Sequence, residues 1–186
     1  MLLTDIQMDA LGEFTNIAAG AAVCYLSNVT EAEIDISTPV FIDIIGDNHS
    51  IDTSGTGIGY KLSFAAFEAG YCAFVIKDNY DAFVRLFGAS DDNLEAIKKY
   101  FQRIMIAAVE PIERLMDRNI AVLLDKDLSN DNNLKFLNEN SRFVCSRFDV
   151  VIDKNISAEI GFIFPLDVAT DIANKFIQDG IELILV

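Results

Sequence analysis

The first thirty residues place hydrophobic side chains at helical spacing and predict an amphipathic helix over residues 4–28. Thr4 followed by Gln7 has the spacing of a capping box, so the helix is expected to begin near Asp5. At about 100° per residue, one stripe of this helix is hydrophobic and is expected to face a core. Its members are Leu11, Phe14, Ala18, Ala22 and Tyr25.

The opposite side of the same helix is polar. Asp9, Glu13 and Asn16 are spaced four and three residues apart and therefore stack there. Gly20 lies one further turn along this side and Gly12 lies at its margin, although glycine costs a helix roughly 1 kcal/mol relative to alanine. From spacing alone, this side is either the solvated side of an amphipathic helix or a surface where bare backbone leaves room for a partner.

Strand patterns follow this helix. Residues 31–37 alternate like a strand, residues 39–46 continue as a second strand-like run, and residues 46–59 gather turn formers and predict a flexible connection. The segments 60–67 and 71–78 predict an antiparallel hairpin that turns at residues 68–70. A short amphipathic helix is expected over residues 79–87, closing on Gly88.

The second half repeats this order at an offset of about 87 residues. It comprises a helical run at 93–117, strand-like runs at 141–153 and 157–164, and a helix at 168–177. Pro111 is expected to end or kink the long helix near residue 110, and the apolar tail 181–186 is expected to pack or to pair at a sheet edge. We therefore predict one domain, 1–186, with halves at 1–88 and 93–186 joined by the polar connector 88–93.

One spacing is specific enough to suggest a family. Asp9, Glu13, Asn16 and Pro39 form the pattern D-x3-E-x2-N-x22-P, which resembles the signature of the chemotaxis phosphatases of the CheC, CheX and FliY type. The surrounding text of residues 3–22 also resembles the first helix of that family. The resemblance implies an α+β fold with two pseudo-symmetric halves that share an antiparallel sheet, and with the long helices on one face.

The resemblance also implies a reaction. Its substrate would be the phosphoaspartate of a CheY-type response-regulator receiver, which brings its own Mg²⁺ and lysine, so that the chain needs no cofactor of its own. Asn16 would orient the attacking water and Glu13 would pair with the lysine of the receiver. Asp9 and Pro39 would support the shape of the helix face and its flanking turn.

The second half lacks this motif. Aligning Asn16 with Arg103 puts Tyr100 opposite Glu13 and Ala96 opposite Asp9, and no second E-x2-N occurs in the helical run. We therefore expect a single working site, with the second half as scaffold.

Composition restricts the classes of partner. A formal charge of −15 argues against nucleic acid and anionic membranes, and favours a partner with a basic face. Although the mean hydropathy is +0.30, the longest uncharged run is shorter than the ~20 apolar residues that span a bilayer. The N-terminal segment has Asp5 and Asp9 where a signal peptide would be basic, so we expect a cytoplasmic protein.

The other candidate chemistry is weak. Cys24, Cys72 and Cys145 lie in apolar segments and are expected to be buried, reduced thiols. His49 lies in a polar loop without a second ligand nearby, so no metal site is expected. Residues 125–133 have oxygen-bearing side chains like a calcium loop but lack its glycine and final glutamate, which predicts a solvated loop.

Family membership does not fix activity. Related proteins also serve as components of the flagellar switch, or bind a CheD-type receptor deamidase and thereby modulate receptor methylation. The alternative function is therefore a non-catalytic interaction module of chemotaxis signalling, and a homodimer is compatible with either function.

Overall fold

The structure, a computed structural model, describes residues 3–44, 50–52, 56–64, 67–88, 94–117, 119–127, 133–135 and 142–184. The helices are α1 (Asp5–Thr30), α2 (Tyr80–Leu86), α3 (Leu94–Met116) and α4 (Leu166–Ile184). The strands are β1 (Ile34–Ile36), β2 (Val40–Ile44), β3 (Ser50–Asp52), β4 (Thr56–Phe64), β5 (Phe67–Ile76), β6 (Ile120–Asp127), β7 (Asn133–Lys135), β8 (Phe143–Ile152) and β9 (Ile156–Pro165).

The two halves of the chain build one antiparallel sheet together. Its strand order is β1-β8-β9-β5-β4-β6, and β2 also pairs with β8. The edge strands are exchanged, because β1 and β2 of the first half pair with β8 of the second, while β6 of the second half pairs with β4 of the first. Strands β3 and β7, one from each half, form a separate pair. The predicted α+β fold with a shared antiparallel sheet is confirmed.

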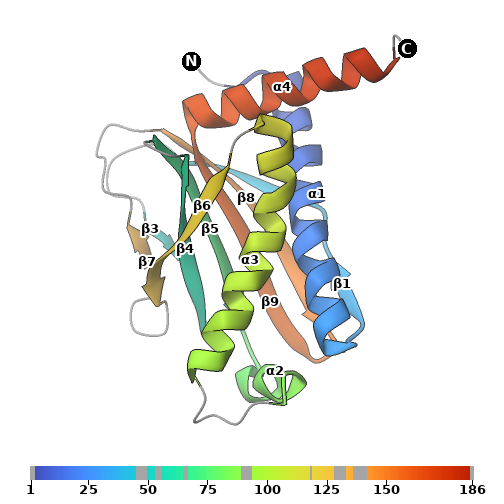
Figure 1. The fold of residues 1–186 in the computed structure, drawn as a ribbon, viewed down its shortest axis with the longest axis vertical. Helices are drawn as coiled ribbons and strands as arrows, with labels where there is room; N and C mark the ends of the chain where they lie inside the picture. The colour runs from blue at the N-terminus through green and yellow to red at the C-terminus, as the bar shows by residue number, and fades with distance from the viewer. Residues whose placement is uncertain are drawn as a thin grey trace.

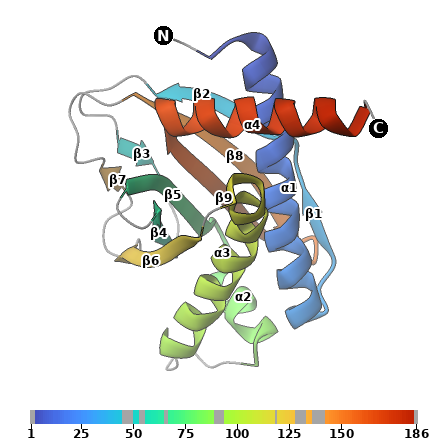
Figure 2. The same ribbon diagram turned by 45° about the horizontal axis from the view of Figure 1, so that its top comes forward.

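The helices cover one face of the large sheet. Figures 1 and 2 show α1 and α3 side by side and running in opposite directions, with α4 crossing the end where α1 begins and α3 ends. Alternate residues of the central strands point toward the helices and are fully buried, as Phe74, Phe148 and Phe162 are. The core therefore lies between the sheet and the helix layer. In the described part of the chain, no helix is long and apolar enough to cross a membrane.

Two strand predictions were wrong because glycines in strands resembled turn residues. The segment 46–59 was expected to be a connection, but it contains β3 and the start of β4, whose register shifts against β6 between Gly59 and Tyr60. The hairpin turn lies before β5 rather than at residues 68–70. Gly70 lies within β5 at φ +135°, and a Cβ there would come within 2.3 Å of the carbonyl oxygen of Ile163. This glycine permits close strand packing rather than a turn.

Two helix predictions also need correction. Pro111 was expected to end or kink α3, and the structure excludes the ending, because the helix continues to Met116. The loss of one hydrogen bond near Ala107 is offset by burial of Val109 and Ile112 against the core. Helix α4 runs from residue 166 to 184, so residues 181–184 of the apolar tail extend this helix and do not pair at a sheet edge.

The remaining connections are only partly described. The segment 125–133 was expected to be a solvated loop, but its first three residues end β6 and its last begins β7. The rest of that segment lies outside the described residues, as do His49 and the connector residues 89–93.

We predict that Gly70→Ala lowers the free energy of unfolding by about 1–3 kcal/mol or more, because φ is unfavourable for alanine and a backbone oxygen occupies the position of the new Cβ. Thermal unfolding measures the loss. Gly161→Ala on the neighbouring β9 is the matched control, since a Cβ there meets nothing within 4 Å. Equal stability of the two variants would contradict this explanation of Gly70.

Candidate functional site

The polar trio of the sequence motif lies on the outer side of α1. Asp9, Glu13 and Asn16 are all exposed, whereas Leu11 and Phe14 are buried in the core, as the spacing predicted. Within the described part of the chain, no hydrogen bond or ion pair joins the three polar side chains to another residue. Their polar atoms are therefore available to a partner.

The trio belongs to a longer exposed stripe of α1. On a helical wheel its members fall within about 100° of one another, opposite the buried side. We call this the α1 stripe; it consists of Ile6, Asp9, Glu13, Asn16, Ile17, Gly20 and Cys24. Ile6 and Ile17 are 69% and 49% exposed, so apolar side chains lie beside the charged ones. Gly12, which was expected at the margin of this side, is buried instead.

The start of α1 is fixed by local and distant hydrogen bonds. The predicted capping box is present, with the backbone N–H of Gln7 donating to Thr4 Oγ1 at 3.3 Å and the backbone N–H of Thr4 donating to Gln7 Oε1 at 2.9 Å. Gln7 Nε2 also donates to Asn174 Oδ1 on α4 at 2.9 Å. Two turns later, the rings of Phe14 and Phe176 pack with centroids 5.8 Å apart. Helix α4 therefore holds the half of α1 that carries the motif.

A buried pair of hydroxyl groups sets which side of α1 faces outward. Thr15 is fully buried and its Oγ1 lies 2.9 Å from Ser146 Oγ on β8, while also donating to the Gly12 carbonyl at 3.2 Å. Because consecutive residues of a helix point about 100° apart, holding Thr15 against the sheet directs Asn16 to solvent. Sequence reasoning missed Thr15, although a polar residue within the apolar side of α1 was a visible signal.

Pro39 lies between β1 and β2, the two short strands that pair with β8 at one edge of the sheet. Residues 37–39 form a bulge between β1 and β2. Ile36 pairs with Val150 and Val40 pairs with Arg147, so three residues of this edge lie opposite only two residues of β8. The Ser37 hydroxyl accepts from the N–H of Asp149 there. Pro39 has no N–H to contribute, so a bulge in an edge strand suits it. Phe41, two residues on, pairs with Ser146, the residue that holds Thr15.

The second half carries no copy of the motif. Helix α3 contains no asparagine. The buried residues of α3 repeat the spacing of those in α1: Phe101, Ile104, Met105 and Ala108 correspond to Thr15, Ala18, Ala19 and Ala22. In this alignment Gln102 corresponds to Asn16 and Lys99 to Glu13. It differs by one residue from the alignment of Asn16 with Arg103 that the sequence alone suggested. Tyr100 is half-buried and stacks on Phe87, with ring centroids 4.3 Å apart.

The cysteines differ from expectation at one position. Cys72 and Cys145 are buried free thiols as predicted, but Cys24 is free and exposed on the α1 stripe. Burial raises the pKa of the Cys72 thiol well above its ordinary range. Burial also raises the pKa of Cys145 to about 12, with Glu159 acting in the same direction and Arg147 in the opposite one. Neither buried thiol is suited to nucleophilic chemistry.

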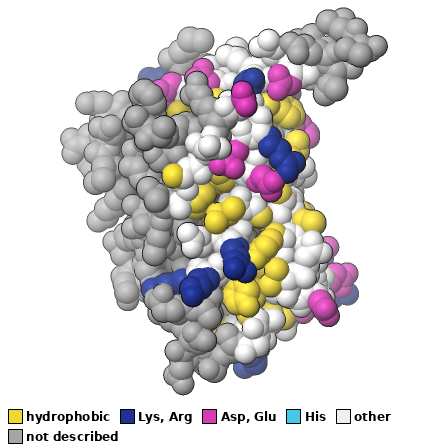
Figure 3. Space-filling model, viewed as in Figure 1, with side chains coloured by type: hydrophobic (Ala, Val, Ile, Leu, Met, Phe, Trp, Pro, Cys, Tyr) yellow, Lys and Arg dark blue, Asp and Glu magenta, His cyan; other side chains and the backbone are white. Residues whose placement is uncertain are grey.

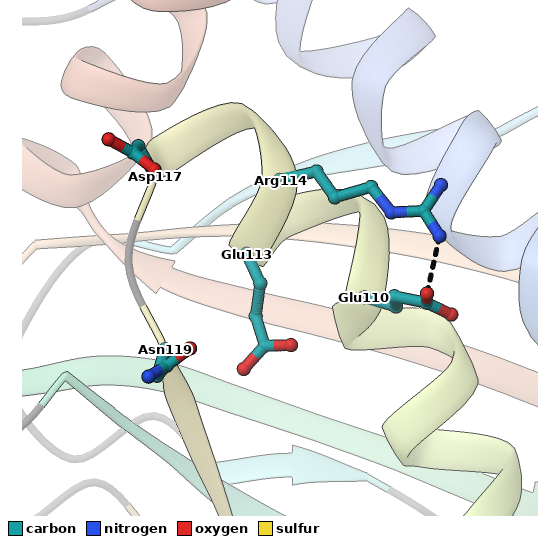
Figure 4. Close-up of a pocket in the computed structure, with 5 residues that line it drawn as sticks. All are labelled: Glu110, Glu113, Arg114, Asp117 and Asn119. Carbon is teal, nitrogen blue, oxygen red and sulfur yellow. Dashed lines mark hydrogen bonds and ion pairs between the residues drawn. The ribbon is translucent and has the colours of Figure 1, made fainter.

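A hollow of about 470 Å³ lies at the C-terminal end of α3 (Figure 4). Its lining residues are Glu110, Glu113, Arg114, Asp117 and Asn119. Glu113 Oε1 accepts the N–H of Ile120 at 2.6 Å, and Arg114 pairs with Glu110. The Glu113 carboxylate therefore links α3 to the start of β6. Among the described residues, no group of three histidine, cysteine or acidic side chains could hold a metal ion.

The helix-covered face has mixed character. Figure 3 shows hydrophobic, basic and acidic side chains interspersed over α1 and α3 rather than separated into broad patches of one charge. Such a face suits contact with another protein better than contact with a polyanion.

These features define an α+β protein of two interleaved repeats that displays an acidic and amide-bearing helix surface. Residues 6–42, which contain all four motif positions, match the family model described as the CheC-like family. No curated protein sequence matches the chain significantly.

Solved structures share the fold over most of the chain. FliY from Thermotoga maritima is 20% identical with a TM-score of 0.66, covering 96% of this chain and 99% of its own. The FliM middle domain from H. pylori is 12% identical with a TM-score of 0.64, covering 93% and 99%. A CheC-like superfamily protein from Shewanella sp. PV-4 is 9% identical with a TM-score of 0.50, covering 81% and 96%.

We predict that Thr15→Val destabilises the protein by about 1–3 kcal/mol, because it removes one partner of a buried hydroxyl pair. Denaturant unfolding of Thr15→Val, Ser146→Ala and the double variant tests this pairing. The double variant should lose less than the sum of the two single losses, since both hydroxyl groups are then absent. Additive losses would show that the two side chains do not stabilise each other.

Proposed function

We propose that this protein stimulates hydrolysis of the phosphoaspartate of a CheY-type receiver domain. The observation that carries the proposal is the exposure of Glu13 and Asn16 on one side of α1, without partners among the described residues. The match of residues 6–42 to the CheC-like family supports it further. Because Glu13 and Asn16 are exposed on a helix surface, these side chains are placed to enter a site that another protein supplies.

Asn16 is the proposed catalytic amide. In the reaction, water attacks the phosphorus, the bond between phosphorus and the aspartate oxygen breaks, and inorganic phosphate and a free aspartate carboxylate result. The amide of Asn16 accepts a hydrogen bond from the attacking water and orients it in line with the breaking bond. Phosphoryl transfer depends mainly on such positioning and on neutralisation of charge.

Glu13 is the proposed docking carboxylate and pairs with the lysine of the receiver. The receiver supplies Mg²⁺ for charge neutralisation, so this chain contributes no metal ligand and no cofactor of its own. Glu13 lies one turn before Asn16 on the same side of α1, which allows one helix to bring both groups to a single phosphoaspartate.

Asp9 and Pro39 have supporting roles in this proposal. Asp9 lies one turn before Glu13, at the N-terminal half of α1 that α4 holds. Pro39 shapes the bulged edge strand, which is linked to the back of the same helix through Phe41, Ser146 and Thr15. Both residues act by placing the α1 surface and not by contact with the phosphoryl group.

The fold similarity to the FliM middle domain favours a second candidate function. In that role the chain is a non-catalytic chemotaxis module in the cytoplasm, binding a component of the flagellar switch or a CheD-type deamidase. The presence of both Glu13 and Asn16 favours the phosphatase over this module. Activity of the parent protein on phosphorylated receivers distinguishes the two functions.

Asn16→Ala should abolish stimulated dephosphorylation and leave the fold intact, because the amide is exposed and makes no hydrogen bond to a residue that the structure describes. The measurement is the decay of phosphate from a panel of phosphorylated receivers, beside a thermal melt followed by circular dichroism. Gln102→Ala on the outer side of α3 is the matched control and should retain full activity. A fully active Asn16→Ala variant would remove this residue from the mechanism.

Glu13→Gln should weaken receiver binding and turnover together. If the carboxylate meets a desolvated lysine, the loss is about 2 to 5 kcal/mol and resists salt. An exposed pair at the rim of an interface would contribute about 0 to 1 kcal/mol and fade as salt rises. Affinity for a phosphate-mimic-loaded receiver, measured across ionic strength, separates these cases. Unchanged binding and turnover at every salt concentration would favour the non-catalytic module.

A further inference from the structure

Gly20 is a glycine in the interior of α1 that the folded chain does not need. It is ten residues from the C-terminal end of the helix, its φ is not positive, and a Cβ placed on it would meet nothing within 4 Å. Glycine is the least favourable residue for a helix interior apart from proline. Alanine would therefore fit and strengthen the helix.

Two other glycines have a conformational or packing reason. Gly88 ends the short helix α2 at φ +62°, and Gly70 packs directly beneath a carbonyl oxygen of β9. Gly180 in α4 is the useful comparison, because it also lies in a helix with open space around its Cα. Gly20 and Gly180 are thus two helical glycines at which a Cβ would meet no other atom within 4 Å, and only Gly20 of these two lies beside the motif.

The position of Gly20 relates it to the motif. It follows Asn16 by four residues and Ile17 by three, so all three lie together on the outer side of α1. Ile17 exposes 49% of its surface, and Gly20 exposes backbone where a side chain would otherwise cover it. Because Gly20 has no side chain, the main chain of a partner can approach the helix closely there, beside the exposed apolar side chain of Ile17.

We infer that the docking surface for the partner extends beyond the motif by one helical turn, with Gly20 as the point where the partner's main chain approaches α1 most closely. The inference rests on the proposed function for the identity of this partner, a phosphorylated receiver domain. Gly20 is a positioning residue, since the clearance it provides lets Glu13 and Asn16 reach the phosphoaspartate. A methyl group there would hold the receiver away from both.

Gly20→Ala, Gly20→Val and the control Gly180→Ala test the inference. Both alanine variants should raise the melting temperature by about 2–4 °C. Only Gly20→Ala should lower affinity for a phosphate-mimic-loaded receiver, by about tenfold, and Gly20→Val should lower it further. In turnover, Gly20→Ala should raise KM more than it lowers kcat. A stability gain accompanied by a binding loss is a result that a purely structural role cannot produce.

Cys24 supplies an independent measure of docking. It is exposed one turn beyond Gly20, whereas Cys72 and Cys145 are buried, so a maleimide should react selectively with Cys24. The loaded receiver should slow this reaction in the parent and in Gly180→Ala, and should protect less in Gly20→Ala. Protection of the parent would place the receiver over this turn of the helix.

The outcomes separate the inference from the proposed function. In one outcome the parent is active, Asn16→Ala is inactive, and Gly20→Ala binds the receiver as tightly as the parent does. This result overturns the inference about Gly20 and supports the proposed phosphatase function. In another outcome the receiver binds the parent but loses phosphate no faster, and Gly20→Ala weakens this binding. This result overturns the phosphatase function and supports the docking surface. If no receiver of the panel binds the parent, both are overturned.

Discussion

The exchange of edge strands between the two halves is the constraint on which the rest of the structure depends. Strands β5 and β9 pair at the centre, and each half sends an edge strand to pair with the inner strand of the other. The first half therefore lacks a complete sheet without β8. The motif helix α1 belongs to the first half, but the hydroxyl that sets its rotation, Ser146, belongs to the second. A side chain contributed by the motif-free half thus orients the side chains that carry the candidate chemistry.

Much of this arrangement could be predicted from local pattern. The capping box at Thr4, the apolar stripe through Leu11 and Phe14, and the repeated order of elements all follow from periodicities of one or two turns. The exchange of strands could not be predicted, because pairing between residues more than a hundred positions apart leaves no local periodicity. Gly70 and Pro111 were misread for a related reason. Their local tendencies favour a turn and a helix end, and tertiary contacts with Ile163 and with the core outweigh those tendencies.

The candidate site was predicted by its spacing and not by its shape. Four residues at fixed intervals identified the outer side of α1, and the structure leaves Asp9, Glu13 and Asn16 exposed there. The hollow at the end of α3 has a different character, since there the carboxylate of Glu113 accepts a backbone N–H of the same chain. A protein that completes the site of another needs a protruding surface, and exposure without internal partners is its physical signature. Exposure of Cys24 on the same stripe was missed because an apolar neighbourhood in sequence resembled a buried one.

The pairing of Thr15 with Ser146 has an evolutionary consequence. Helix α3 carries neither the glutamate nor the asparagine of the motif, so the candidate chemistry places no restraint on its outward residues Lys99, Gln102 and Arg103. The strand β8 has no such freedom, since a change at Ser146 is felt by the helix that retains the motif. The two repeats are therefore expected to tolerate substitution unequally: the second can vary on its outer helix surface, whereas a change in its sheet at Ser146 also affects the helix of the first.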